Sequence, residues 1–81
     1  MHMMTDQERW VLAVGDIVDE LIDLTEAESG AEVVQRLPHA VLVRTTHRRA
    51  SELRRLPNAI IRVFETERDG QRALGLFEPG S

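Results

Sequence analysis

The side chains that could do chemistry in this sequence are few and widely separated. The chain has no cysteine and three histidines, which are His2, His39 and His47. His47 has no nearby carboxylate at ligand spacing, and three scattered histidines give no metal template. Ser51 lacks the glycine-flanked turn that exposes a nucleophilic serine. Glu65 and Glu67 would project from one face of a strand, a spacing typical of a solvated surface. The sequence therefore predicts a protein that is not an enzyme, with no metal site and no cofactor.

Length and composition indicate one small domain. The chain has 81 residues, close to the lower limit at which a hydrophobic core alone stabilises a fold. We assign residues 9–79 to this domain and interpret residues 1–8 as a disordered or vector-derived N-terminus. No run reaches the ~20 apolar residues of a membrane span, and no signal-peptide pattern is present. We therefore expect no membrane partner and a cytoplasmic location, or a secreted one if the chain is cut from a longer precursor.

Hydrophobic periodicity predicts the elements of the first half of the chain. The continuous apolar run 10–14 is typical of a buried strand. A helix over residues 16–27 follows, because apolar residues recur there at helical spacing and acidic residues occupy the first turn. Gly30 ends this helix, since glycine adopts the backbone conformation that helix ends often need. Residues 31–37 then predict a second strand.

A strand, a helix and a strand follow in the second half. Residues 40–45 are rich in β-branched side chains and predict the third strand. Thr46 can cap a helix, and Pro57 cannot continue it. One apolar stripe runs along this helix at a spacing of three residues: Ala50, Leu53 and Leu56. Residues 60–64 return as the fourth strand, parallel to the third because a helical crossover joins the two.

This order of elements predicts an α+β ferredoxin-like sandwich. Two βαβ units form a four-stranded antiparallel sheet with both helices on one face. After the fourth strand, Asp69-Gly70 has the composition of a hairpin turn. We therefore expect a fifth, C-terminal strand over residues 72–77, ended by Pro79.

The charge is divided unevenly along the chain. Residues 1–32 hold nine acidic residues and one arginine, whereas residues 33–81 hold nine arginines and five acidic residues. The simplest interpretation is that an acidic first helix lies beside a basic second helix. We do not expect nucleic acid to be the partner, because the central strand 40–45 has no aromatic side chain on which a base could stack.

The predicted sheet has more apolar surface than two helices on one face can cover. A sheet with one open face should alternate apolar and polar residues, yet strands 40–45 and 60–64 are apolar on both sides. The sequence leaves open which set faces the helices. The other set would form an exposed apolar patch, which marks an interface. The candidate partners are a second copy of the chain, through faces or edges of the sheet, and another protein.

Several segments in this order resemble the propeptide-type inhibitors of subtilisin-like serine proteases. The segments are Gly30-Ala31-Glu32-Val33-Val34-Gln35-Arg36-Leu37, Ala40-Val41-Leu42-Val43, Ala50-Ser51-Glu52-Leu53-Arg54-Arg55-Leu56-Pro57, and Ile60 to Val63 with Glu65. The resemblance covers about residues 10 to 65 and rests on patterning. His39 departs from it, because the family usually has glycine before the third strand.

The resemblance implies a protein-binding domain that acts as inhibitor and folding chaperone of a subtilisin-like serine protease. In that family the helix-free sheet face contacts the protease and the C-terminal tail lies in its cleft. The residues that we assign to partner binding on this basis are Leu42, Ile60, Phe64, Leu74, Leu76, Phe77 and Glu78. A paired strand over residues 72–77 would withdraw the tail from such a cleft. The alternative is a ferredoxin-like assembly or regulatory module that binds its own copy, or a small ligand, and no protease.

Overall fold

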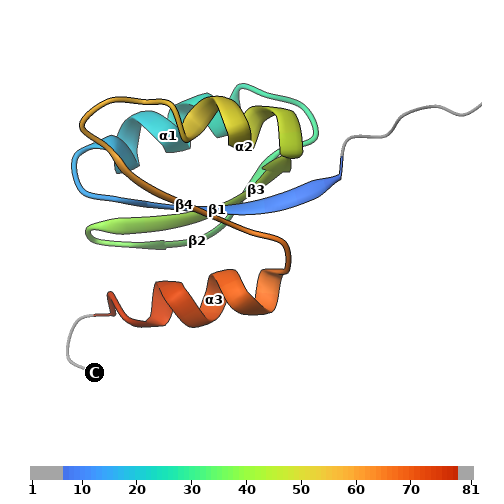
Figure 1. Cartoon of the computed structure of the whole chain (residues 1–81). Helices are drawn as coiled ribbons and strands as arrows, with labels where there is room; N and C mark the ends of the chain where they lie inside the picture. Colours follow the sequence, from blue (N-terminus) through green and yellow to red (C-terminus); the bar gives the residue numbers. More distant parts are fainter. Residues whose placement is uncertain (1–6, 79–81) are drawn as a thin grey trace, which may run out of the picture.

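The computed structural model describes residues 7–78, which form a sheet between two layers of helices (Figure 1). The elements are β1 Glu8–Val14, α1 Ile17–Glu26, β2 Glu32–Leu37, β3 Ala40–Thr46, α2 His47–Leu53, β4 Ile60–Phe64 and α3 Glu67–Gly75. The strand order is β2-β3-β1-β4, and every neighbouring pair is antiparallel. The predicted ferredoxin-like α+β fold is confirmed.

The central strand β1 begins at Glu8, two residues before the apolar run 10–14 that predicts it and one residue before the predicted domain boundary. The sequence prediction places Glu8 in the N-terminal segment 1–8, of which residues 1–6 lie outside the described residues. Pairing holds Glu8 in place, because it lies opposite Thr46 of β3. Further along, Val11 lies opposite both Val43 of β3 and Val63 of β4. The continuous apolar run of β1 is therefore covered by strands on both edges.

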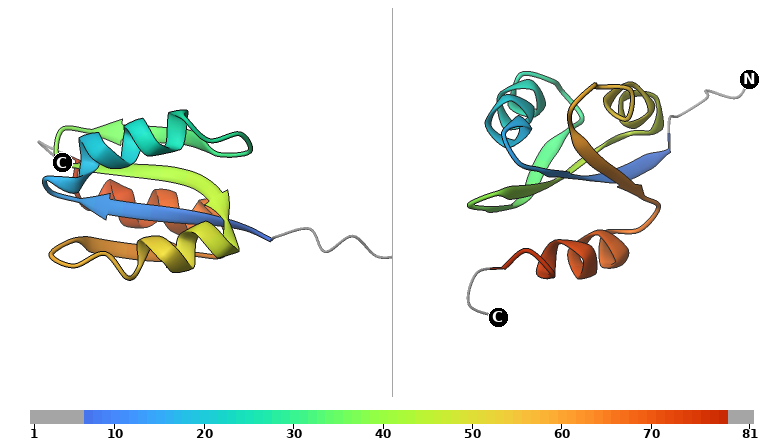
Figure 2. Two further views of the ribbon diagram at one scale, coloured as in Figure 1. Left: turned by 90° about the horizontal axis from the view of Figure 1, so that it is seen from above. Right: turned by 60° about the vertical axis from the view of Figure 1, so that its left-hand side comes forward.

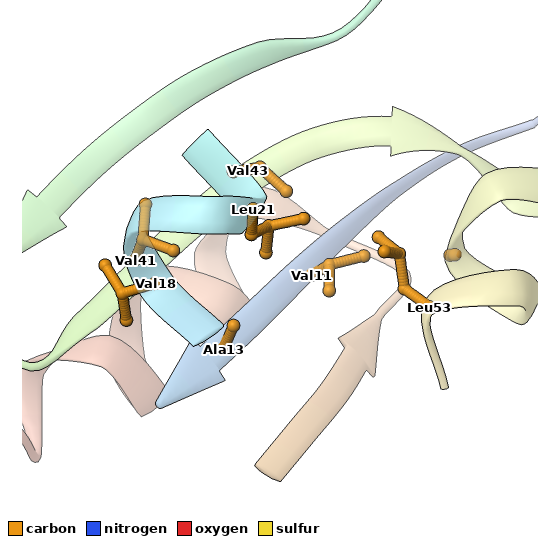
Figure 3. Packing of buried hydrophobic residues seen from close by; sticks show 8 residues of the cluster. Val11, Ala13, Val18, Leu21, Val41, Val43 and Leu53 are labelled. Atoms are coloured by element: carbon orange, nitrogen blue, oxygen red, sulfur yellow. The ribbon is translucent and has the colours of Figure 1, made fainter. Parts of the chain in front are cut away.

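The helices α1 and α2 cover one face of the sheet, as predicted (Figure 2). Their apolar sides meet the sheet side chains Val11, Ala13, Val41 and Val43 in one buried cluster (Figure 3). The helices contribute Val18, Leu21, Ala50 and Leu53. Thr46 caps α2, because its hydroxyl accepts a hydrogen bond from the backbone N–H of Arg49 at 3.2 Å.

The C-terminal segment differs from the prediction. Residues 67–75 form the helix α3, and the predicted hairpin at Asp69-Gly70 and fifth strand over 72–77 are wrong. Thr66 begins the helix, since its hydroxyl accepts a hydrogen bond from the backbone N–H of Asp69 at 3.2 Å. Gly70 and Leu74 are both buried, and their four-residue spacing places them on one face of α3. Pro79, predicted to end the strand, lies outside the described residues.

The helix α3 covers the face of the sheet opposite α1 and α2 (Figure 1). Its Leu74 joins Leu12, Ala40 and Leu42 in a second buried cluster. The prediction of an open apolar sheet face is therefore wrong, because the chain's own C-terminal helix covers the centre of that face. The fold has three layers, and both apolar sets of β3 are buried.

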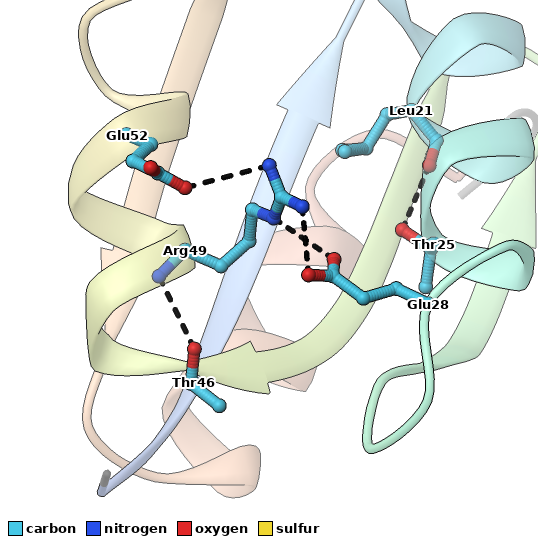
Figure 4. Close-up of polar contacts among 6 residues, drawn as sticks. All are labelled: Leu21, Thr25, Glu28, Thr46, Arg49 and Glu52. Carbon is cyan, nitrogen blue, oxygen red and sulfur yellow. Dashed lines mark hydrogen bonds and ion pairs between the residues drawn. The ribbon is translucent and has the colours of Figure 1, made fainter.

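One of the ion pairs that join the acidic and basic halves of the chain links α2 to the segment that follows α1 (Figure 4). Arg49 of α2 donates hydrogen bonds to both carboxylate oxygens of Glu28, at 2.8 and 2.7 Å. The hydrogen bond to Glu28 is the main cause that raises the pKa of Arg49 above its ordinary value. Glu52, one turn along α2, lies 3.4 Å from the same guanidinium. Glu28 follows the end of α1 at Glu26, so this pair joins α2 to the segment after α1, and the complementarity of the two helices themselves stays a prediction.

Candidate functional site

The residues predicted to bind a partner divide into a buried and an exposed group. Leu42 and Leu74 are fully buried and belong to the cluster beneath α3, so neither can contact a partner in this structure. Phe64 is partly buried beside that cluster. The exposed members lie at the start of β4 and after α3: Ile60, Leu76, Phe77 and Glu78.

An apolar groove of about 490 Å³ lies between β4 and α3. It is lined by Phe64, Asp69, Arg72, Ala73 and Leu76. The groove exists because α3 packs mainly against β1 and β3 and to a lesser extent against β4. The face of β4 on that side is therefore incompletely covered.

The edge strand β4 continues this surface. Ile60 and Phe64 lie on the same side of β4, because side chains alternate along a strand. Ile60 is 62 % exposed, and Leu76 beside the groove is 83 % exposed. Within the described chain β4 pairs only with β1, so its outer backbone groups face solvent. We call Ile60, Phe64, Ala73 and Leu76 with the outer edge of β4 the β4–α3 surface.

A second, polar cavity lies on the other side of β4, next to α2 (about 210 Å³). His47 and Ser51, which the sequence presents as isolated groups, both line it. The structure adds Arg9 and Arg54, which come from β1 and from the end of α2. Glu65 also lines this cavity, whereas its predicted companion Glu67 begins α3.

Sequence reasoning missed three lining residues of the apolar groove, Asp69, Arg72 and Ala73, because it assigned them to a hairpin. A helix cap and a helical spacing of apolar residues in this segment could have identified them. Thr66 is followed three residues later by an acidic residue, and small or apolar residues recur at 70, 73, 74 and 77. This spacing describes a short amphipathic helix.

Among residues 7–78, no group of three histidine or carboxylate side chains is arranged so that it could hold a metal ion. In the same part of the chain, no helix has the length and apolar character needed to cross a membrane. No protein-family model matches this chain, and no curated protein or solved structure matches it significantly.

Proposed function

We propose that this protein is a non-catalytic assembly module that binds a second copy of itself through the β4–α3 surface. The observation that carries the proposal is Ile60, a large apolar side chain that is 62 % exposed on an edge strand. Edge strands present unpaired backbone groups that readily accept another strand. Natural edges are usually protected by charge, by proline or by a covering element.

The groove next to β4 supports the same proposal. A strand added to β4 would place alternate side chains over the groove, where Phe64 and Ala73 offer apolar contact. A second β4 carries two apolar side chains on one side, Ile60 and Phe64, with the exposed Arg62 between them. Pairing of two β4 edges would join two sheets and cover both copies of Ile60 around one two-fold axis.

The two faces of the sheet are less suitable for association. The helices α1 and α2 cover one face and α3 covers the centre of the other. Face-to-face packing of two sheets would therefore require α3 to leave Leu42 and Leu12. Pairing along β4 requires no such rearrangement.

Sedimentation velocity of the intact protein and of Ile60→Arg tests this proposal. We expect the wild type to dimerise in a concentration-dependent manner, and Ile60→Arg to weaken the dimer by at least about tenfold, because a charge replaces buried apolar surface. Leu24→Arg is the matched control, because Leu24 is 46 % exposed on α1, away from β4. A wild-type protein that stays monomeric at high concentration, or equal weakening by both variants, would contradict the proposal.

A second candidate function follows from the exposed end of the described chain. Leu76 and Phe77 are 83 % and 43 % exposed, and Glu78 is exposed beside them. These three residues lie after α3, so they could enter a protease cleft while the fold stays intact. They support the alternative proposal that the protein inhibits a subtilisin-like serine protease through its C-terminal segment.

The inhibitor proposal is tested by titrating a subtilisin-like protease with the intact protein and with a version that ends at Gly75. This truncation keeps Leu74 in place over Leu42, whereas a cut before α3 would uncover the sheet. Inhibition by the intact protein that is lost on truncation would support tail insertion. No inhibition of several such proteases by the intact protein would exclude this function.

A further inference from the structure

The polar cavity beside α2 is built from three elements. It is lined by Arg9 of β1, by His47, Ala50, Ser51 and Arg54 at α2, and by Val63 and Glu65 at β4. Ala50 and Val63 pack in or against the core beneath α2, so they form an apolar floor. The other side chains form a polar rim. The cavity lies on the opposite face of β4 from the apolar groove.

The backbone explains why these side chains converge. His47, Ser51 and Arg54 are spaced by four and three residues, which places them on one side of α2 and its last turn. Trp10 lies opposite Phe64 in the sheet, so Arg9 and Glu65 occupy the next opposed positions along the two strands. Both then point to the same face as Val11 and Val63, the face that α2 covers.

Within residues 7–78, neither arginine of this cavity forms an ion pair with a carboxylate. Elsewhere Arg49 pairs with Glu28, and Arg36 pairs with Asp19. Arg9 donates instead to two neutral acceptors, Oε1 of Gln7 and the backbone oxygen of Glu8, both at 2.8 Å. Among residues 7–78, no hydrogen bond or ion pair involves the guanidinium of Arg54. Two arginines without an ion pair to any described carboxylate therefore line one cavity.

We propose that this cavity binds a small soluble phosphomonoester through its phosphoryl group. Guanidinium groups donate paired hydrogen bonds that match phosphate oxygens, and Ser51 and His47 add donors. Because Arg9 comes from β1 and Arg54 directly follows α2, the donors reach the ligand from two directions. A tetrahedral group with three terminal oxygens uses such an arrangement better than a planar carboxylate does. The floor of Ala50 and Val63 would contact the organic part of the ligand.

The carboxylate of Glu65 opposes the binding of an anion in this cavity. This carboxylate lies on the rim, at the strand position opposed to Arg9, and repels an incoming anion. Removal of its charge should therefore tighten phosphate binding. Glu65→Gln changes this charge with little change of shape, so it tests the electrostatic argument separately from the packing.

The experiment is an NMR titration of the amide signals with inorganic phosphate and with glycerol phosphate at constant ionic strength. We expect saturable shifts at His47, Ser51 and Arg54, an affinity about tenfold lower in Arg54→Gln, and a higher affinity in Glu65→Gln. Arg55→Gln is the matched control, because this neighbouring arginine is exposed and does not line the cavity. Its affinity should equal that of the wild type.

Three results would overturn the proposal. These are the absence of saturable shifts with both probes, equal weakening by Arg54→Gln and Arg55→Gln, and equal shifts with acetate at the same concentration. An equal loss of affinity in the two variants would mean that phosphate binding depends only on the net charge of the protein. Ile60→Arg should leave phosphate binding unchanged, since Ile60 lies outside this cavity. Failure of the phosphate site and failure of self-association can therefore be told apart.

Discussion

Gly70 of α3 lies directly against Leu42 of β3. A Cβ atom added at Gly70 would lie 2.9 Å from Leu42 Cδ1 and 3.3 Å from Trp10 Cβ, both closer than ordinary van der Waals contact. Leu42 is fully buried and has little room to move. The glycine that suggested a hairpin turn is therefore the residue that lets α3 approach the sheet.

The first prediction compares the same substitution at two glycines of α3. Gly70→Ala should lower the free energy of unfolding by about 1 kcal/mol, because overpacking outweighs the gain in helix propensity. Gly75→Ala should raise it by about 0.5 kcal/mol, because an added Cβ there meets nothing within 4 Å. Urea denaturation measures both. Equal stabilisation by the two variants would mean that α3 does not pack closely on Leu42.

The second prediction tests whether α3 is part of the core. Leu74→Ala should lower the free energy of unfolding by about 3 kcal/mol, since it leaves a cavity beside Leu12 and Leu42. Leu76→Ala should change it by less than about 0.5 kcal/mol, because Leu76 is exposed. Thermal or urea unfolding distinguishes them. Similar effects of the two substitutions would be inconsistent with a docked helix and would favour an extended C-terminal segment.

The third prediction concerns the contact between α2 and Glu28, which follows α1. A double-mutant cycle with Arg49→Gln and Glu28→Gln should give a coupling free energy of about 0.5 kcal/mol, because both side chains are more than one-third exposed and water screens them. The coupling should shrink in high salt. A coupling free energy of zero at low salt would mean that this ion pair does not stabilise the packing of α2 against the segment after α1.

The order of strands and helices from β1 to β4 could be predicted because each element has its own local signal. The apolar run of β1 indicates a strand that is covered on both faces, and Thr46 marks the start of α2. The end of α2 at Leu53 comes earlier than Pro57 predicts. The candidate sites could be predicted only in part. Ile60 is exposed as expected, whereas Leu42 is not, and the cavity with Arg9 and Arg54 joins residues far apart in the chain.

The sequence by itself determined the ferredoxin-like core, because periodicity and caps are encoded within each segment. Only the tertiary structure decided the C-terminal segment. Residues 67–75 include two glycines and are too short to form a stable helix alone, and Asp69-Gly70 is also compatible with a hairpin. The apolar face of Leu12 and Leu42 resolves this ambiguity. A helix that places Gly70 and Leu74 on that face buries it, and this burial supplies the stability that local propensity lacks.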